Sequence, residues 1–566
     1  MNLKTVLCCS LLMNGCCLFA GGNPVHLSSA GFLPESPKKA TVTLECATFS
    51  VHCASTGDTV FQGRAEGPLY QNDVNQSVWI IDFSSLEKDG TYYLSVPEVG
   101  NSIPFEIGNH IFSDLFRTVV RAMYLWRCGT AVEGIHDGNV FAHSACHMED
   151  GWLDYLGEPG KQRDGTGGWH DAGDHGKYVV NAGITVANMF MAWDHFRQRV
   201  AGIPLDLPET APGFPEYLEE IKWETDWLLK MQLPGGSGVV SHKLTRLSFP
   251  GFIMPEDDLE KRYFSDWSTA ATADFAAVMA MAARYFQPYD PEYADTCLAA
   301  AIRSYHYLRE NPEQKHPDIR MFRTGAYITG DTDDRMWAAA ELWETTGDDA
   351  YLKDFEEKAA VYVPQRWGGR TEPTDSMKID ENWDWAEIRN LGMFTYLLSA
   401  REGRDPALLA EIREDLLAVA DTLVGKSRAD VYGRPLAGRY YWGCNGTVAR
   451  QVQNLMIACR IDPRPEYREA ALDAIAHLFG RNYYGRSYVT GVGFRPPMFP
   501  HDRRSAADSL AAPWPGYLIG GGHSAVDWKD EEESYATNEV AINWQAALIY
   551  ALAGFLPAPG QEGTVP

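Results

Sequence analysis

The sequence predicts a mainly α-helical protein in which an (α/α)6 barrel follows a small all-β immunoglobulin-like sandwich. Residues 24–108 alternate apolar and polar side chains with a period of two, whereas residues 110–557 repeat apolar side chains with a helical period. The chain of 566 residues is also too long for a single ordinary core. We therefore divide it into a signal peptide at 1–20, domains at 24–108 and 110–557, and a flexible tail at 558–566.

The first 20 residues have the composition of a secretory signal peptide. Lys4 precedes an apolar run, and small residues follow, so we expect cleavage after Ala20. The stretch "MNGC" weakly resembles a lipoprotein box, which makes lipid anchoring at Cys16 the alternative. No later stretch is long and apolar enough to cross a bilayer. The sequence therefore predicts a secreted or periplasmic protein.

The β pattern is clearest in "KKATVTL" and "TYYLSVP", and "LEKDGTYYL" supplies a turn before a strand. An immunoglobulin-like sandwich fits this length and turn spacing, with another small β sandwich as the alternative. Cys46 and Cys53 lie in this module and are candidates for a disulfide. The module shows no obvious aromatic strip, so we expect it to stabilise the barrel rather than to bind a polymer.

The helical pattern begins at a Ser cap in "SDLFRTVVRAMYLWR". In the segment after Lys177, Val179, Val186, Phe190 and Trp193 fall on one helical face. Similar segments recur along the chain and give about twelve helices. Twelve helices make six hairpins, which close into a toroid whose loops build a cleft at one end. A helical solenoid is the alternative, but the sequence shows no repeat.

Charge and composition narrow the classes of ligand. The formal net charge is -27, which repels nucleic acid and anionic membranes and disfavours a polyanionic substrate. A neutral substrate is therefore the simplest expectation. The chain also holds 17 Trp, 27 Tyr and 24 Phe, which fits either large cores or flat surfaces for stacking sugars.

Two acids stand close together in "GGWHDAGDHGKYVVNAG". Asp171 and Asp174 are surrounded by small residues, which let backbone and ligand approach closely. Two such acids can hold one water between them, one polarising it and the other fixing its direction. The alternative is that one of them caps the helix that begins near Val179.

A third acid, Glu539, opens the last strong helical segment and is followed by Val540, Ala541 and Ile542. Apolar surroundings raise the pKa of a carboxyl group, as a general acid requires, whereas a helix N-terminus favours the anion. A helix-stabilising acid in the first turn is the alternative.

Two further groups carry polar side chains of functional type. His501 and Arg503 lie in a Gly/Pro loop, where both can donate hydrogen bonds to sugar hydroxyls, with a surface ion pair as the alternative for Arg503. The second group offers the ligands of a closed structural zinc site, with a disulfide as the alternative for its two thiols: Cys128, Cys146, His147 and His170.

Three of these stretches resemble, in the right order, the motifs of glycoside hydrolase family 9, the inverting cellulase family. "GGWHDAGDHGKYV" is similar to its base motif, "PHDR" to its histidine signature and "DEEESYATNEVAIN" to its acid signature. The β module and the helical body resemble the subgroup with an N-terminal immunoglobulin-like domain. The resemblance implies an (α/α)6 barrel that hydrolyses a β-linked glucan without an organic cofactor.

The resemblance also assigns roles. It implies that Asp174 is the general base, that Asp171 helps to hold the nucleophilic water and that Glu539 is the general acid. It implies that His501 and Arg503 bind the sugar beside the scissile bond. Asp530 matches an acid of the C-terminal signature that orients the site, and the aromatic candidates for stacking sugars are Tyr440, Tyr441 and Trp442.

The subgroup's structural zinc set is similar to the Cys2His2 group, and the family often binds calcium. The acidic loop "PEDDLEKRYFSD" is the candidate for calcium, without assigned ligands. The chain departs from the family's pattern at four positions near the site, none of which removes a catalytic carboxylate: His175, Cys444, Asp502 and Gln545. His175 stands where a Tyr is common.

We therefore expect a monomeric, endo-acting β-1,4-glucanase. An exo-acting β-glucosidase or exo-β-glucosaminidase of the same fold is the closest alternative. A polysaccharide lyase would need a basic cleft, which the acidic chain disfavours, and a non-catalytic sugar-binding protein would not need an acid–base set.

Overall fold

The computed structural model describes residues 22–208, 212–364 and 371–558. The predicted signal peptide, Cys16 and all but the first residue of the predicted tail lie outside the described residues.

The N-terminal domain is a β sandwich, as predicted. One sheet has the strand order β1-β2-β6-β5, and the other has β4-β3-β7-β8 with β9 also paired to β7. Apolar residues from both sheets share one core, in which Phe32 packs edge-on against Phe83 and Phe105. The strands are β1 (Val25–His26), β2 (Lys39–Val42), β3 (Thr48–Cys53), β4 (Thr59–Arg64), β5 (Glu66–Gln71), β6 (Gln76–Asp82), β7 (Gly90–Val96), β8 (Gly100–Asn101) and β9 (Phe105–Ile107).

The predicted disulfide of this domain is not formed. Cys46 and Cys53 are both free thiols, and Cys53 Sγ forms a hydrogen bond with the Ser55 hydroxyl. The sandwich core therefore holds without a covalent link between them.

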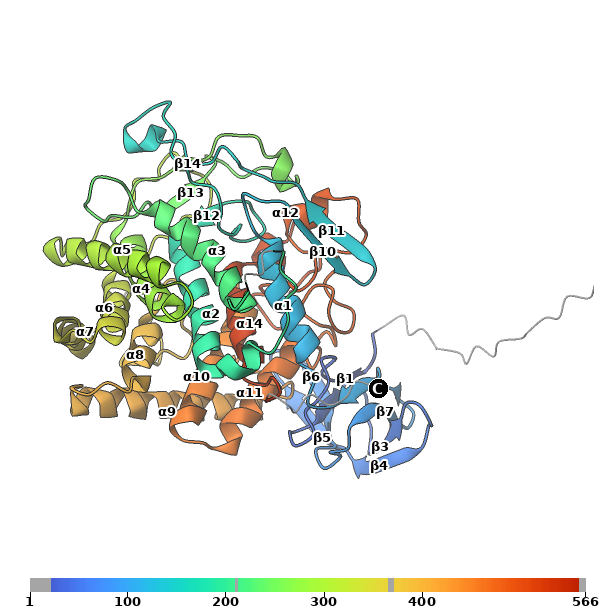
Figure 1. Ribbon diagram of the computed structural model, residues 1–566. Coiled ribbons are helices and arrows are strands. Elements are labelled where there is room, and N and C mark those ends of the chain that lie inside the picture. Colours follow the sequence, from blue (N-terminus) through green and yellow to red (C-terminus); the bar gives the residue numbers. More distant parts are fainter. Residues whose placement is uncertain (1–21, 209–211, 365–370, 559–566) are drawn as a thin grey trace, which may run out of the picture.

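The second domain is the predicted (α/α)6 barrel, whose helices make up the larger part of the molecule in Figure 1. Twelve of the helices in the described residues have ten residues or more. The inner set is α2 (Val179–Val200), α4 (Thr269–Phe286), α6 (Thr332–Thr346), α8 (Arg389–Leu398), α10 (Cys444–Ile461) and α14 (Ile542–Ala553). The outer set is α1 (Ser113–Leu125), α3 (Glu216–Met231), α5 (Pro291–Glu310), α7 (Asp349–Val361), α9 (Pro406–Ala429) and α11 (Pro465–Leu478).

Burial explains which helices are inner and which are outer. All twelve residues of α14 are buried, and α4 is buried along almost its whole length. In α5 the buried residues recur every three to four positions, so only one stripe faces the core. The inner helices pack on one another in the order α10, α14, α2, α4, α6 and α8, and each outer helix packs on an adjacent inner one. Between α8 and α10 the Asn390 amide donates to Asn454 (3.3 Å).

The two domains share a contact made of both apolar and polar groups. Val74 and Val78 pack with Val431 and Tyr432, and Thr41 Oγ1 donates to the Val431 carbonyl (2.7 Å). In Figure 1 the β domain lies beside α11. The predicted stabilising role of the β module is compatible with this contact.

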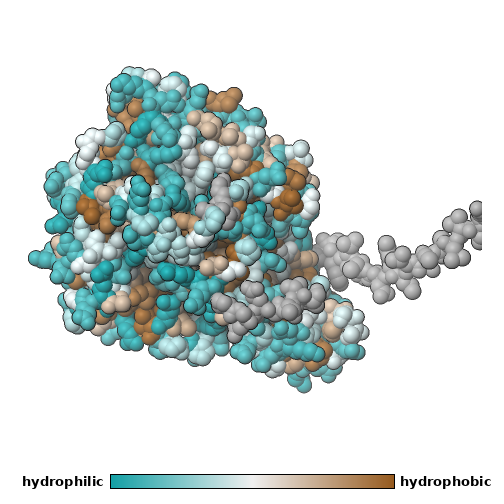
Figure 2. Space-filling model, viewed as in Figure 1, coloured by the Kyte–Doolittle hydropathy of each residue, from teal (hydrophilic) through white to brown (hydrophobic). Residues whose placement is uncertain are grey.

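The surface seen in Figure 2 is largely hydrophilic, with hydrophobic residues scattered in small groups. Within the described residues, none of the helices has both the length and the apolar character needed to span a membrane.

Candidate active site

The loop that carries the acid pair is held by backbone bonds to two distant segments. The Asp171 carbonyl accepts from the amide of Ile542 (2.9 Å), and the Gly173 carbonyl accepts from the amide of Arg503 (3.1 Å). Gly173 lies so close to His501 that an added Cβ would stand 2.0 Å from the His501 carbonyl oxygen. Only glycine fits there, which explains the glycine between the two acids.

Neither acid caps a helix. Helix α2 begins at Val179, and its N-cap is Tyr178, without a side-chain cap bond. The capping alternative is therefore wrong. Asp171 and Asp174 lie before β12 (Lys177–Tyr178), and both are buried.

The two carboxyl groups have different hydrogen-bond partners. Asp174 Oδ2 accepts from the amide of Gly176 (2.9 Å) and the hydroxyl of Tyr178 (3.0 Å). Asp171 accepts from the Asn181 amide (2.8 Å) and the Tyr327 hydroxyl (2.7 Å). Burial, together with the charge of Asp174, raises the pKa of Asp171 to about 8.

Glu539 lies in an extended segment next to this loop. Its neighbour Ala541 forms an antiparallel bridge with Ala172, and Glu539 itself bridges His501 in parallel. The Glu539 carbonyl accepts from the Gly520 amide (2.8 Å). The structure thus brings the acid segment and the acid pair together, although they are far apart in the chain.

The prediction that Glu539 opens a helix is wrong. The four-residue helix α13 (Tyr535–Asn538) ends just before it, and α14 starts at Ile542. Glu539 therefore lies outside the first turn of a helix. Burial raises its pKa well above the usual value, and the charges of Asp174 and Asp171 add to the effect. The charge of Arg503 and a hydrogen bond with Trp442 lower this pKa.

His501 and Arg503 flank the carboxyl groups. The His501 ring contacts Phe252 and Tyr535, with ring centroids 5.5 and 6.0 Å away, and burial lowers its pKa. Arg503 Nη1 donates to the Gly173 carbonyl (2.7 Å), and its Nε donates to Pro250 (3.1 Å). Both side chains therefore border the loop of the acid pair.

Asp530 lies outside the carboxyl cluster. It accepts from the backbone amides of Met498 (2.9 Å) and Phe499 (2.9 Å) and pairs with Arg486 (2.6 Å). These hydrogen bonds fix the loop segment that leads to His501. Asp530 therefore has the geometry of a positioning residue.

The three aromatic candidates separate in the structure. Trp442 is 43% exposed, and its ring contacts that of Tyr535 in a tilted arrangement, with centroids 5.4 Å apart and 58° between the ring planes. Gly443 places it there with a φ of +89°, and an added Cβ on Gly443 would lie 2.6 Å from Trp544 Nε1. Tyr441 bonds to Thr447, whereas Tyr440 donates to Asp73 of the β domain (2.9 Å). Tyr440 thus belongs to the domain contact.

Sequence reasoning missed several aromatic residues of the site. Tyr178 stood inside the quoted motif "HGKYVV", but nothing in the pattern indicated that its hydroxyl reaches Asp174. Tyr327 and Phe252 come from loops that carry no motif. Phe499 and Tyr535 stand close to His501 and Glu539 in the sequence and are exposed in the structure, and this closeness to motif residues is the signal that could have found them.

The predicted metal ligands form a compact cluster. Cys128, Cys146, His147 and His170 each offer one ligand atom, and these atoms all lie within 4.8 Å of one another. Cys128 Sγ is 3.5 Å from His147 Nδ1, Cys146 Sγ is 3.9 Å from His170 Nε2, and the two nitrogens are 3.4 Å apart. Both cysteines are free thiols, so the disulfide alternative is not formed.

These spacings fit a tetrahedral ion. With Zn–S of about 2.3 Å and Zn–N of about 2.0–2.1 Å, tetrahedral angles require S···N of about 3.5 Å and N···N of about 3.3 Å. His147 also has a φ of +52°, a strained conformation for a non-glycine residue that is common at functional sites. The donor set therefore suits zinc.

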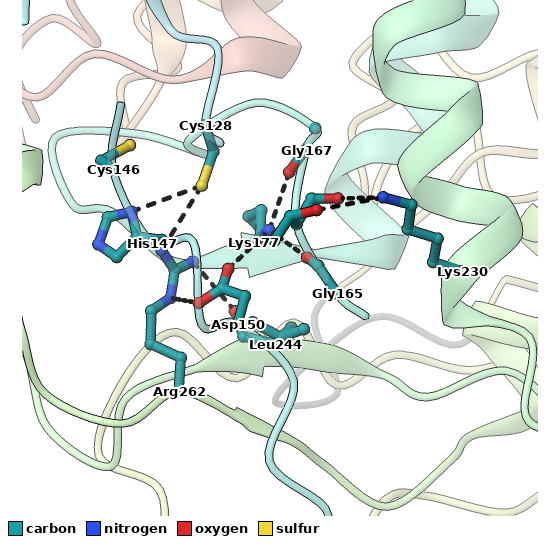
Figure 3. Close-up of polar contacts among 12 residues, drawn as sticks. Cys128, Cys146, His147, Asp150, Gly165, Gly167, Lys177, Lys230, Leu244 and Arg262 are labelled. Atoms are coloured by element: carbon teal, nitrogen blue, oxygen red, sulfur yellow. Dashed lines mark hydrogen bonds and ion pairs between the residues drawn. The ribbon is translucent and has the colours of Figure 1, made fainter. Parts of the chain in front are cut away.

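Buried charges surround the cluster, as Figure 3 shows. Arg262 approaches Cys128 Sγ (3.8 Å) and pairs with Asp150 (3.4 Å), which in turn pairs with Lys177 (2.9 Å). Lys177 Nζ also donates to the Gly165 and Gly167 carbonyls (2.7 and 2.8 Å). His170 directly precedes Asp171, and Gly167 lies a few residues before it. The cluster and its charged neighbours therefore anchor the loop of the acid pair.

The acidic loop proposed for calcium has other partners. Asp258 pairs with Arg246 (2.6 Å), and Glu256 accepts from the Ser144 amide (3.2 Å). Within the described residues, both clusters that could hold a metal contain histidine, and neither consists of the hard oxygen ligands that calcium prefers.

Comparisons with known proteins agree with the fold and the motifs. The family model "Glycosyl hydrolase family 9" matches residues 112–552, and "Cellulase N-terminal ig-like domain" matches residues 20–101. Endoglucanase D of Acetivibrio thermocellus is 51% identical over 534 residues, which cover 94% of this chain and 83% of that protein. Cellodextrinase of Butyrivibrio fibrisolvens is 32% identical, covering 94% of this chain and 99% of that one.

Among solved structures, a Zn-binding triple mutant of the family 9 endoglucanase J30 has a TM-score of 0.84 and 33% identity. The match covers 93% of this chain and 100% of that one. The resemblance seen in three motifs thus extends over both domains, and this chain belongs to glycosyl hydrolase family 9, in the form that carries an N-terminal immunoglobulin-like domain.

Proposed function

We propose that this chain is an endo-acting β-1,4-glucanase that hydrolyses glucan with inversion at the anomeric carbon. The observation that carries the proposal is the backbone pairing of the Glu539 segment with the loop of Asp171 and Asp174. The name of the 51% identical relative, an endoglucanase, supports the substrate and the mode of attack.

The proposed reaction is a single displacement with one proton donor and one proton acceptor. Glu539, whose pKa is raised by burial and by nearby anions, keeps its proton and delivers it to the glycosidic oxygen. Asp174 takes a proton from the water that attacks the opposite face of the sugar. Inverting hydrolases leave about 6.5–9.5 Å between such carboxyl groups to make room for this water.

The other residues of the site would orient this reaction. Asp171, whose carboxyl group is fixed by hydrogen bonds from Asn181 and Tyr327, would orient the attacking water. His501 and Arg503 would bind hydroxyls of the sugar beside the scissile bond. Trp442, exposed and next to Glu539, would stack on a sugar ring.

Zinc is the metal we propose for the Cys2His2 cluster. The Zn-binding relative and the ligand spacing support it. Such a closed site is structural and supplies folding energy rather than a reactive water. Here it would hold the segment from Cys128 to His147 against His170 and thereby support the loop of the acid pair.

Calcium binding is a further part of the proposal, but no residue of the acidic loop is assigned as a ligand. Metal analysis of the purified chain would distinguish zinc alone from zinc with calcium.

An exo-acting enzyme is the second candidate, because one relative is named a cellodextrinase. Products from long cellooligosaccharides distinguish the two: internal cuts give a range of sizes, whereas exo action gives one small product. Secretion completes the proposal, supported by the apolar leader of the sequence.

The experiment that tests the roles compares Glu539→Gln and Asp174→Asn on two substrates. On cellooligosaccharides we expect both variants to lose about 10²–10⁴-fold in kcat. On an aryl cellobioside with an activated leaving group, which needs no protonation, Glu539→Gln should keep most of its activity and Asp174→Asn should not. Glu533→Gln, an exposed acid of the same segment, is the matched control. If Glu539→Gln lost as much activity on the aryl cellobioside as on cellooligosaccharides, the assignment of Glu539 as the proton donor would be overturned.

A further inference from the structure

A second group of buried side chains adjoins the metal cluster and shares one residue with it. His147, His175 and Asp258 come from three separate segments, and their side chains are 1%, 3% and 1% exposed. The ligand atoms of the three residues all lie within 4.8 Å of one another.

The polar atoms of this group face one another without hydrogen bonds. His147 Nε2 and His175 Nδ1 each lie 3.6 Å from Asp258 Oδ2, just beyond hydrogen-bond length, and these three atoms have no other hydrogen-bond partner. A buried polar group without a partner costs about 1–3 kcal/mol, so three such atoms aimed at one point need an explanation. A small displacement would turn both 3.6 Å contacts into hydrogen bonds.

A metal ion in the neighbouring cluster would make this arrangement useful. His147 turns Nδ1 towards Cys128 and His170, so a metal bound there requires the ring proton on Nε2. That proton points at Asp258. Histidines that bind metals usually donate their second N–H to a carboxylate, which fixes the ring and strengthens the ligand.

Asp258 is itself held in place. Its other oxygen, Oδ1, accepts from Arg246 Nη1 (2.6 Å), so Oδ2 is presented to the two histidines. On the far side of Asp258 is His175, the residue that follows the proposed base. The Asp174 carboxylate accepts from the amide of Gly176, so the direction of this turn sets the direction of the base.

We propose that Asp258 is a positioning residue that connects the metal-binding His147 to His175 and thereby aligns Asp174 for catalysis. The connection runs from the metal through His147, Asp258 and His175 to the loop of the base. It rests on the proposed roles of zinc and Asp174.

A second metal ion held by the same three residues is the competing explanation. Asp258 would be the only anionic ligand of that ion, and Arg246 already neutralises it. Arg262 adds another positive charge close by. A single carboxylate that already pairs with Arg246 gives a second dication little compensating charge, which favours the hydrogen-bonded connection.

The test uses the full-length chain and four variants: Asp258→Asn, Asp258→Glu, His175→Phe and the double variant Asp258→Asn/His175→Phe. Glu260→Gln is the matched control, because Glu260 is an exposed acid of the same loop that pairs with the same Arg246 (2.7 Å). Zinc affinity is measured by competition with a chromophoric chelator, zinc content by elemental analysis, and kcat and KM on a cellooligosaccharide at saturating zinc.

We expect Asp258→Asn to weaken zinc binding about 10–100-fold, the usual effect of losing such a carboxylate partner. At saturating zinc it should lower kcat with little change in KM, and Asp258→Glu should restore part of kcat. His175→Phe should lower kcat while leaving zinc affinity nearly unchanged. The double variant should be no worse in kcat than the more severe single variant, because both break one connection.

Three results would overturn the proposal: unchanged zinc affinity in Asp258→Asn, additive losses of kcat in the double variant, or two zinc ions per chain of which one is lost in His175→Phe. Thermal melting of each variant checks that it is folded, and Asp258→Glu keeps the test open if Asp258→Asn does not fold. Loss of activity in Asp174→Asn, with Asp258→Asn fully active, would leave the proposed function standing and refute the connection alone.

Discussion

Glu539, Asp171 and Asp174 share one functional group and differ in what surrounds it. Asp174 accepts an amide and a hydroxyl hydrogen bond on one oxygen, which fix the direction of its carboxyl group. Burial and the two aspartates raise the pKa of Glu539, which suits a proton donor. Arg503 opposes this effect, because its positive charge stabilises the ionised form of Glu539.

The charge of Arg503 should therefore be visible in the pH profile. Arg503→Met removes the cation, so the pKa of Glu539 rises further and the acid keeps its proton to higher pH. We expect the alkaline limb of kcat/KM to move to higher pH, together with a lower kcat/KM from the lost sugar contact. Arg503→Lys keeps the charge and should leave the limb in place. A limb that moves to lower pH in Arg503→Met would contradict this account of Glu539.

At the scale of residues, the sequence identifies the proposed catalytic and sugar-binding residues better than the residues that orient them by hydrogen bonds. The three acids, His501 and Arg503 are brought together in one place by the structure. The hydroxyl partners Tyr178 and Tyr327 were missed, since their role depends on how loops fold back. Tyr440 is a candidate for sugar stacking by sequence, but in the structure its hydroxyl donates to Asp73 across the domain contact.

At the scale of elements, the extended segment from Glu539 to Ala541 connects the loops that form the site. Its apolar residues continue the helical pattern of α14, so periodicity alone placed the helix start too early. Bridges to Ala172 and Ile519 hold its backbone extended instead. Such tertiary hydrogen bonds override local propensity, and a single sequence does not reveal them.

The segment that leads to Trp442 depends on the β domain. Arg434, whose side chain is 2% exposed, pairs with Asp430 (2.7 Å) and with Asp73 of the β domain, which also accepts from Tyr440. Asp73→Asn would leave this buried guanidinium with one acid partner. We expect it to lower the free energy of unfolding by about 1–3 kcal/mol, measured by denaturant unfolding.

The matched control for that measurement is Asp58→Asn, which alters an exposed acid of the same domain. If Asp73→Asn is as stable as this control, the polar contact between the domains contributes nothing measurable. Reduced binding of substrate in Asp73→Asn would show in addition that the contact supports Trp442.

At the scale of the whole molecule, the barrel could be predicted because its periodicity is strong. Inner helices such as α4 and α14 are apolar on all sides, while outer helices such as α5 have one apolar stripe. Which loops meet at the end of the barrel could not be predicted from periodicity, because loops are placed by hydrogen bonds between distant residues. Motif resemblance supplied that information for the acids, but not for His175 and Asp258.

The account's central claim is that Glu539 and Asp174 act on opposite faces of one sugar linkage. Proton NMR of a cellooligosaccharide digest tests it most directly, if spectra are recorded before the new reducing ends equilibrate. Inversion of a β linkage predicts that the α anomer appears first. If the β anomer appears first, the configuration is retained, and the assignment of Asp174 as a water-activating base is wrong.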